Sequence, residues 1–205
     1  MRPGHPMHTR RQLLLSGAGA AAAAALGGAA VAGSASASGV APAESEAMRV
    51  YRLLSVEQLM LFTYDQVLVA PAVTPRTRRA LAPLRAQEET HVHVLAAQLA
   101  ALGGVAPSSP TSVAVANVDL ARRRVKGRLG QLRGDQDALR LLISTERVVV
   151  GAYFVALTMI EDRRLIVLVT RIMANDSQHE ALIGELLYPG DTPKAVPFGL
   201  VQGVQ

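Results

Sequence analysis

The chain contains no cysteine and no tryptophan, and aromatic residues make up only 3% of its 205 residues. The absence of cysteine excludes disulfides, thiolate zinc sites, a cysteine nucleophile and lipid attachment through a processed N-terminal cysteine. Half of the residues are still apolar, and they are mainly Val, Ile, Leu and Ala. This composition favours closely packed helices over a β-sandwich, and the length suits one ordinary domain with extensions.

Acidic residues are absent from the first 37 positions, and the whole chain carries a formal net charge of +5. Three of the 21 Lys and Arg residues and none of the 16 Asp and Glu residues lie in this segment, so the remainder has a net charge of +2. A charge that small gives no support to a nucleic-acid partner. The segment also holds His5 and His8, to which we assign no site role.

Residues 1–37 have the features of a targeting segment. Arg10 and Arg11 are followed by Gln-Leu-Leu and a weakly apolar run of Ala and Gly, and residues 35–37 form an Ala-Ser-Ala cleavage signal. The paired arginines resemble a twin-arginine export signal, which directs the export of folded proteins, often with a cofactor already bound. The alternatives are an ordinary secretory signal or an uncleaved anchor, although the run is too weakly hydrophobic for a convincing membrane span. We therefore expect an extracytoplasmic protein, either secreted or held in the cell envelope.

Four long segments with helical periodicity follow a small-residue linker at 38–45. Apolar residues three or four positions apart predict helices at about 46–70, 74–102, 135–160 and 163–187. Their N-cap candidates include Thr74, either Asp135 or Asp137, and Asp162. Pro83 either kinks the second helix or marks its true start, and both interpretations stay open. Residues 189–205, with three prolines and three glycines, are expected to form an irregular tail.

A long link joins the second and third of these helices and contains a basic run. Arg122-Arg123-Arg124 and Lys126 fall within a short helix that we expect over about 117–132. The ordinary interpretation of such a run is a solvated face. The alternative is a contact with a partner or with anionic lipid.

The most informative stretch is Glu88-Glu89-Thr90-His91 in the second helix. Residues three apart share a helix face, so Glu88 and His91 point the same way, along a stripe that also carries Leu84 and Leu95. A carboxylate and an imidazole on an apolar stripe cost free energy unless something compensates them, and a metal ion is one such partner. Glu89 and His93 fall off this face and are expected at the surface.

The same pattern occurs twice along the chain. Each half has a helix with a single inward carboxylate and a tyrosine seven residues later, followed about 30 residues on by a helix with carboxylate-x-x-His. The first half contains Glu57, Tyr64, Glu88 and His91, and the second contains Glu146, Tyr153, Asp176 and His179.

This order resembles the ferritin-like di-iron and di-manganese carboxylate proteins, in which two helices supply one Glu each and two supply Glu-x-x-His. The resemblance covers residues 46–188 and implies an all-α fold, an antiparallel four-helix bundle with one long crossover between helices 2 and 3. With the export signal, the chain looks like the exported ferritin-like proteins and not like the cage-forming ferritins.

The resemblance implies two metal ions per chain, iron or manganese, and six ligands. Without thiolates, a soft-metal site is not expected. Glu88 and Asp176 would bridge the ions, and Glu57 and Glu146 would be terminal. The candidate ligands are Glu57, Glu88, His91, Glu146, Asp176 and His179.

Asp176 departs from the family pattern, which has Glu at this position. Its side chain is one methylene shorter, so we expect it to bridge poorly and to weaken or abolish the second metal site. Each candidate also has a plainer interpretation. Glu57 and Glu146 could pair with Arg52 or Arg147, and Asp176 and His179 could line a polar pocket. The tyrosines Tyr64 and Tyr153 could be core residues or could donate hydrogen bonds to the carboxylates.

Two functions follow from the resemblance. The first is an exported di-metal protein with ferroxidase, peroxide or oxygen chemistry. The alternative is a non-catalytic ferritin-like scaffold or binding module whose metal site is degenerate. The expected partners are metal ions, with no nucleic acid and with membrane contact only through the export segment, and a homodimer is left open. The sequence contains no Ser-His-Asp set, phosphate-binding glycine loop or His-Glu-x-x-His motif.

Overall fold

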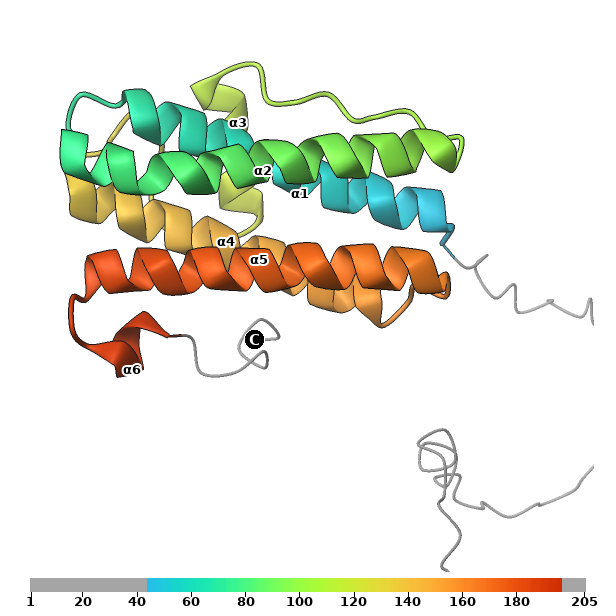
Figure 1. The fold of residues 1–205 in the computed structure, drawn as a ribbon. Coiled ribbons are helices and arrows are strands. Elements are labelled where there is room, and N and C mark those ends of the chain that lie inside the picture. Colours follow the sequence, from blue (N-terminus) through green and yellow to red (C-terminus); the bar gives the residue numbers. More distant parts are fainter. Residues whose placement is uncertain (1–43, 197–205) are drawn as a thin grey trace, which may run out of the picture. The chain divides into compact units, whose positions relative to one another are not determined.

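The computed structural model describes residues 44–196, and this part of the chain contains helices and no strands. The helices are α1 (Glu46–Val69), α2 (Pro75–Ala101), α3 (Val113–Arg122), α4 (Asp135–Leu157), α5 (Arg163–Leu187) and α6 (Thr192–Ala195) (Figure 1). The expected export segment, most of the linker and the end of the expected tail lie outside the described residues. None of the described helices has the length and apolar character needed to cross a bilayer.

Side-chain caps fix where most of the long helices begin. The side chain of Thr74 accepts a hydrogen bond from the Thr77 amide at the start of α2, and that of Asp162 accepts from the Arg164 and Leu165 amides at the start of α5, as predicted. The predicted cap of α4 was wrong, because Gly134 holds that position. Asp135 lies within the first turn of α4 and instead accepts hydrogen bonds from Thr74, outside its own helix.

Pro83 lies inside α2 and does not mark its start, since the helix is continuous from Pro75 to Ala101. The short helix of the crossover, α3, is displaced from its expected position at 117–132. Ser112 caps it, and it ends before Arg124, whose backbone is left-handed, in a segment where Gly127 and Gly130 also have positive φ. In the expected irregular tail, residues 192–195 form the short helix α6.

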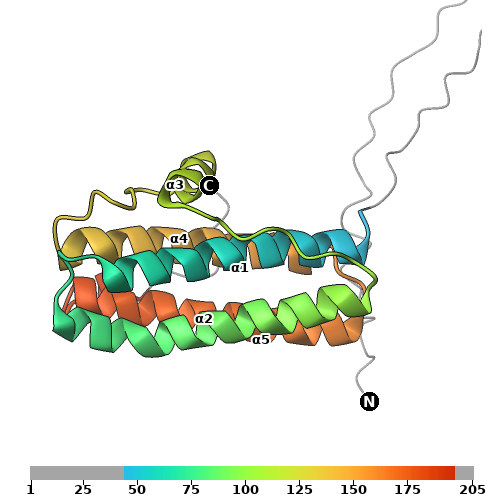
Figure 2. The ribbon, with the colours of Figure 1, turned by 90° about the horizontal axis from the view of Figure 1, so that it is seen from above.

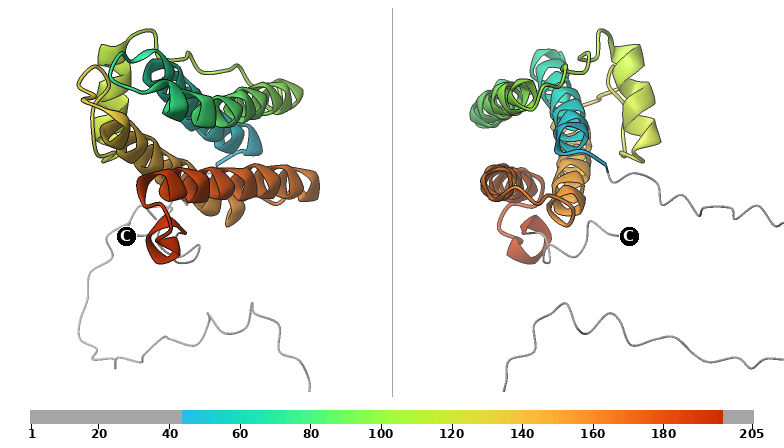
Figure 3. Two further views of the ribbon diagram at one scale, coloured as in Figure 1. Left: turned by 60° about the vertical axis from the view of Figure 1, so that its left-hand side comes forward. Right: turned by 90° about the vertical axis from the view of Figure 1, so that its right-hand side faces the viewer.

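The four long helices form a bundle of two antiparallel pairs, α1 with α2 and α4 with α5 (Figure 2). A long crossover between α2 and α4 carries α3, which packs against α1 outside the bundle (Figure 3). This is the predicted ferritin-like arrangement. Because all four long helices present an apolar face inward, polar side chains on those faces are brought together in the middle.

Candidate metal centre

Six polar side chains from four helices meet inside the bundle. Exposure is 0% for Glu57, Glu88, Glu146 and Asp176, 1% for His179 and 7% for His91. The structure therefore brings together all six residues that the sequence pattern selected. Carboxylates this deeply buried are rare in proteins unless they are paired or bind a metal.

The six side chains form two overlapping groups, and in each the potential ligand atoms lie within 4.8 Å of one another. Glu88 and Asp176 belong to both groups. The first group is completed by Glu57 and His91, and the second by Glu146 and His179. Two adjacent positions that share two carboxylates could therefore each hold a metal ion.

Each histidine directs its Nδ1 atom at the carboxylates. His91 Nδ1 lies 3.2 Å from Asp176 Oδ1 and 3.6 Å from Glu88 Oε2. His179 Nδ1 lies 2.7 Å from Glu88 Oε1 and 3.5 Å from Glu146 Oε1. The two rings stack with their centroids 6.0 Å apart. The two imidazoles thus lie side by side, one in each donor group.

A family model described as a ferritin-like domain matches residues 38–189. The chain belongs to the ferritin-like family. No match was found among curated proteins or among solved structures. The family and the fold thus agree with the resemblance inferred from the repeated carboxylate and histidine pattern.

Two amide side chains complete this ferritin-like centre, and the sequence pattern did not identify them. His91 Nε2 lies 2.9 Å from Asn175 Oδ1, and His179 Nε2 lies 2.6 Å from Gln87 Oε1. An amide oxygen only accepts, so each contact keeps the proton on Nε2 and leaves Nδ1 facing the carboxylates. Gln87 and Asn175 each directly precede the carboxylate of their own motif, and that repeat was the available signal.

Both repeated tyrosines also contact the cluster. Tyr64 donates a hydrogen bond of 2.7 Å to Glu146 Oε1, and Tyr153 donates one to Glu57 Oε1. Of the two interpretations left open, these contacts select hydrogen bonding to the carboxylates. Each tyrosine donates its hydrogen bond to the carboxylate of the other half of the repeat, so these bonds join the two halves.

Burial and mutual repulsion set the charge state of the cluster. Burial, followed by the charge of Glu57, raises the pKa of Asp176 to about 6 and raises the pKa of Glu88 well above its usual range. Burial and the charge of Glu88 do the same to the pKa of Glu146. Although burial alone lowers the pKa of His91, its attraction to the carboxylates of Asp176, Glu57 and Glu88, which face its Nδ1 atom, raises that pKa to about 12. The raised pKa values show that four ionised carboxylates this close together are unfavourable without added positive charge.

Unpartnered atoms provide a test of whether this donor set fits metal ions. Buried polar atoms almost always have a hydrogen-bond partner, so each exception needs an explanation. Five carboxylate oxygens and one imidazole nitrogen of the cluster have none among residues 44–196: Glu57 Oε2, Glu88 Oε2, Glu146 Oε2, both Asp176 oxygens and His91 Nδ1. Hard oxygen and imidazole donors converging on one buried spot fit divalent iron or manganese.

The plainer interpretation of Glu57 and Glu146 as ion-pair residues is not supported by the contacts. Arg52 pairs with Glu44 at 2.8 Å, and Arg147 pairs with Glu180 at 2.6 Å. Glu89 pairs with Arg85 and His93 is exposed, so both lie outside the cluster, as predicted.

Proposed function

We propose that this protein is an exported ferritin-like protein that holds two divalent metal ions, iron or manganese, in the middle of its bundle. The observation that carries the proposal is the pair of buried donor groups that share Glu88 and Asp176 and in which five carboxylate oxygens have no hydrogen-bond partner among residues 44–196. Glu57 and His91 would hold one ion, Glu146 and His179 the other, and Glu88 and Asp176 would lie between them.

Such ions, when bound, supply one-electron chemistry with oxygen or peroxide, which is the basis for proposing ferroxidase or peroxide activity. The residues around them have distinct tasks. Tyr64 and Tyr153 hold one oxygen of each terminal carboxylate, and Gln87 and Asn175 fix the tautomers of the two histidines. The apolar core around the cluster keeps bulk water away from it.

Asp176 supports a second candidate function, a ferritin-like scaffold or binding module with a degenerate site. Its shorter side chain predicts weaker binding at one ion position than Glu would give. Its place in both donor groups supports a shared role for its two oxygens. The Asp176→Glu variant tests whether side-chain length limits metal affinity. If it does, metal binding at the weaker position should tighten in this variant.

Metal content decides between the two functions. Protein purified from its native export route should contain about two iron or manganese ions per chain. Glu146→Ala should lose metal without losing its fold, whereas Glu89→Ala, a surface carboxylate in a helix of the same bundle, should keep its metal. A stable protein with almost no metal after purification and after anaerobic reconstitution would favour the scaffold.

The export part of the proposal is supported by the sequence of residues 1–37. Replacing both Arg10 and Arg11 by Lys should block a twin-arginine pathway and leave precursor in the cytoplasm, because that pathway recognises the paired arginines. An ordinary secretory signal would tolerate the change, since Lys preserves its positive start.

A further inference from the structure

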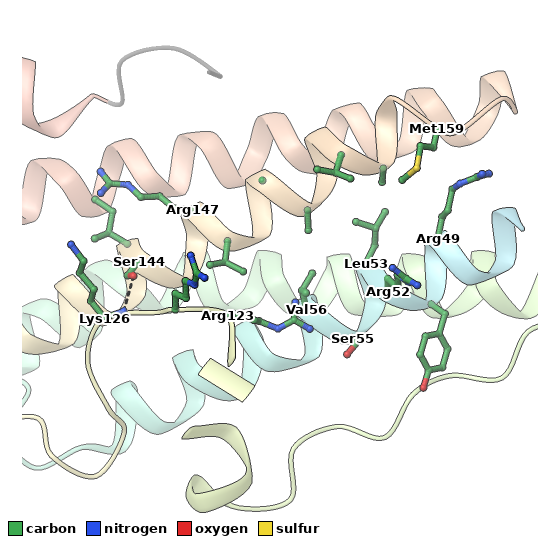
Figure 4. Close-up of a pocket in the computed structure, with 18 of the residues that line it drawn as sticks. Arg49, Arg52, Leu53, Ser55, Val56, Arg123, Lys126, Ser144, Arg147 and Met159 are labelled. Carbon is green, nitrogen blue, oxygen red and sulfur yellow. Dashed lines mark hydrogen bonds between the residues drawn. The ribbon is translucent and has the colours of Figure 1, made fainter. Parts of the chain in front are cut away.

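A large groove lies along α1 and α4 and is separate from the metal centre. It has a volume of about 1190 Å³ and is bordered by the crossover segment around Arg123 and Lys126 and by the end of α5 at Leu187. Figure 4 shows Lys126 and Arg147 toward one end, and Arg49 and Met159 toward the other. Ligand pockets in proteins commonly have volumes of about 300–1,000 Å³, so this groove has room for a sizeable small molecule.

Apolar side chains from α1 and α4 line much of the groove, together with polar residues such as Ser55 and Ser144. Leu53 and Val56 line it from α1, Ile143 and Val155 line it from α4, and Met159 lines it just beyond the end of α4. Val155 and Met159 are 51% and 40% exposed, so apolar surface faces solvent at this end. Between Ser144 and Ala156, two residues of α4 that line the groove, the helix axis advances about 18 Å at 1.5 Å per residue, a length that suits an extended hydrocarbon chain.

Within residues 44–196, the arginines near the start of α1 have acidic partners, whereas several cations at the crossover end do not. Near the start of α1, Arg52 pairs with Glu44, and Arg49 lies 3.9 Å from Glu46. At the crossover end, no acidic side chain among residues 44–196 lies within ion-pair distance of Arg123, Arg124 or Lys126. Arg140, also at this end, has as its one hydrogen-bond partner in the described part of the chain the neutral amide of Gln136.

Arg123 is half-buried at this end, and burial lowers the pKa of its guanidinium. An incoming anion stabilises a cation that is partly removed from water and has no acidic side chain in contact with it. The crossover end is therefore the place where a negatively charged head group would gain most.

Arg124 occupies a position where glycine would be less strained. It ends α3 with φ of 59°, where the Arg124 amide bonds to Ala121 O and the Val125 amide bonds to Leu120 O. α2 ends in the same hydrogen-bonding pattern with Gly103 at the left-handed position. An arginine there keeps a cation at the groove in spite of its backbone cost.

We propose that the groove binds a single-chain amphiphile with an anionic head, of the long-chain fatty-acid class. The head lies among Arg123, Arg124 and Lys126, and the hydrocarbon tail lies along α4 toward Met159. A second copy of this chain docked on the same face would place these cations against each other, which disfavours self-association there. A nucleic acid would leave the apolar walls unmatched.

Saturable binding of palmitate, measured by calorimetry on the full chain below the micelle concentration, tests the proposal. One palmitate per chain is expected, and hexadecanol, which lacks the charge, should bind at least about tenfold more weakly. Replacing Arg123 and Lys126 together by Gln should weaken palmitate binding about tenfold or more and leave hexadecanol binding little changed. Arg79→Gln removes an exposed cation of α2 outside the groove and should have no effect.

Two further variants keep the result interpretable. Ala152→Phe fills the groove from α4 and should abolish binding of both palmitate and hexadecanol while the helical circular dichroism is retained. Arg124→Gly should raise the melting temperature, because glycine adopts the left-handed backbone conformation without strain. The same variant should weaken palmitate binding, because it removes a cation from the groove. The proposal is overturned if palmitate does not saturate, if the double variant binds it normally, or if the protein binds only phosphatidylglycerol vesicles and not free palmitate.

Discussion

At the scale of single residues, four side chains around the metal ligands explain how the cluster keeps its shape. They contact the histidines and the terminal carboxylates. Asn175 and Gln87 hold the far nitrogen of each imidazole, and Tyr64 and Tyr153 hold the terminal carboxylates. None of these four need bind a metal. Orientation of this kind sets ligand basicity and ring position, so it governs metal affinity from outside the ligand set.

Asn175 offers the sharpest test of that role. Replacing it by Leu removes the acceptor for His91 Nε2 and should weaken metal binding by roughly 10–100-fold. Competition with a chromogenic chelator would measure the loss. Asn175→Asp keeps an acceptor and should retain most of the affinity, so equal losses in the two variants would contradict a hydrogen-bonding role.

Asp176 should make the metal-free protein sensitive to pH. Its folded-state pKa of about 6 lies above the ordinary value of 3.8, so the folded state binds the proton more tightly than the unfolded state does. This stabilising contribution is complete below pH 3.8 and is lost as the pH rises through about 6. Metal-free Asp176→Asn should therefore match the wild type at pH 4 and exceed its free energy of unfolding at pH 7 by about 1–3 kcal/mol.

Urea denaturation in the presence of a chelator measures this difference in the free energy of unfolding. Added metal should reverse the difference, because only the wild type has all six ligands to bind it. A constant difference between the two proteins from pH 4 to pH 7 would contradict the assigned cause.

The six candidate ligands could be predicted from sequence because each is fixed by spacing within one helix. Glu88 and His91 are three apart, and a helix places such residues on one face whatever surrounds it. The contact of His91 with Asn175 joins residues 84 positions apart. This contact depends on how α2 packs against α5, and the spacing of residues within one helix does not determine that packing.

At the scale of helices, Asp135 links the turn between α1 and α2 to the start of α4. It accepts hydrogen bonds of 2.7 Å from the Thr74 amide, the Thr74 hydroxyl and the Thr77 hydroxyl. Asp135 was a predicted N-cap of its own helix because Asp commonly occupies that position. That rule describes one helix at a time, so it could not reveal that this carboxylate binds Thr74 and Thr77 at the start of another helix.

Asp135→Ala should lower the free energy of unfolding by about 1–2 kcal/mol, because three donors lose their charged acceptor. Denaturant unfolding measures the loss. Asp137→Ala is the matched control, since the one partner of Asp137 among residues 44–196 is Arg133 at the surface, and its loss should have a much smaller effect. Equal effects would show that Asp135 does not join the two helices.

At the scale of the whole molecule, neither half of the repeat contains a finished centre. Each donor group draws ligands from both halves, and each tyrosine and each amide reaches across to the other half. The bundle and its one long crossover could be predicted, because four amphipathic helices with inward ligands have few ways to pack. The groove could not be predicted, since it depends on where the crossover lies against α1 and α4.

Metal binding should therefore stabilise the bundle as one unit. A divalent ion that binds only the folded state at a free concentration 100 times its dissociation constant adds about 2.7 kcal/mol per site. Thermal unfolding of the metal-loaded protein should shift upward in a single transition, and a chelator should reverse the shift. In Glu146→Ala the shift should be smaller, because one donor group loses a ligand. If added metal stabilised α1 and α2 but not α4 and α5, hydrogen exchange would show protection confined to one helix pair, and a centre shared between the halves would be ruled out.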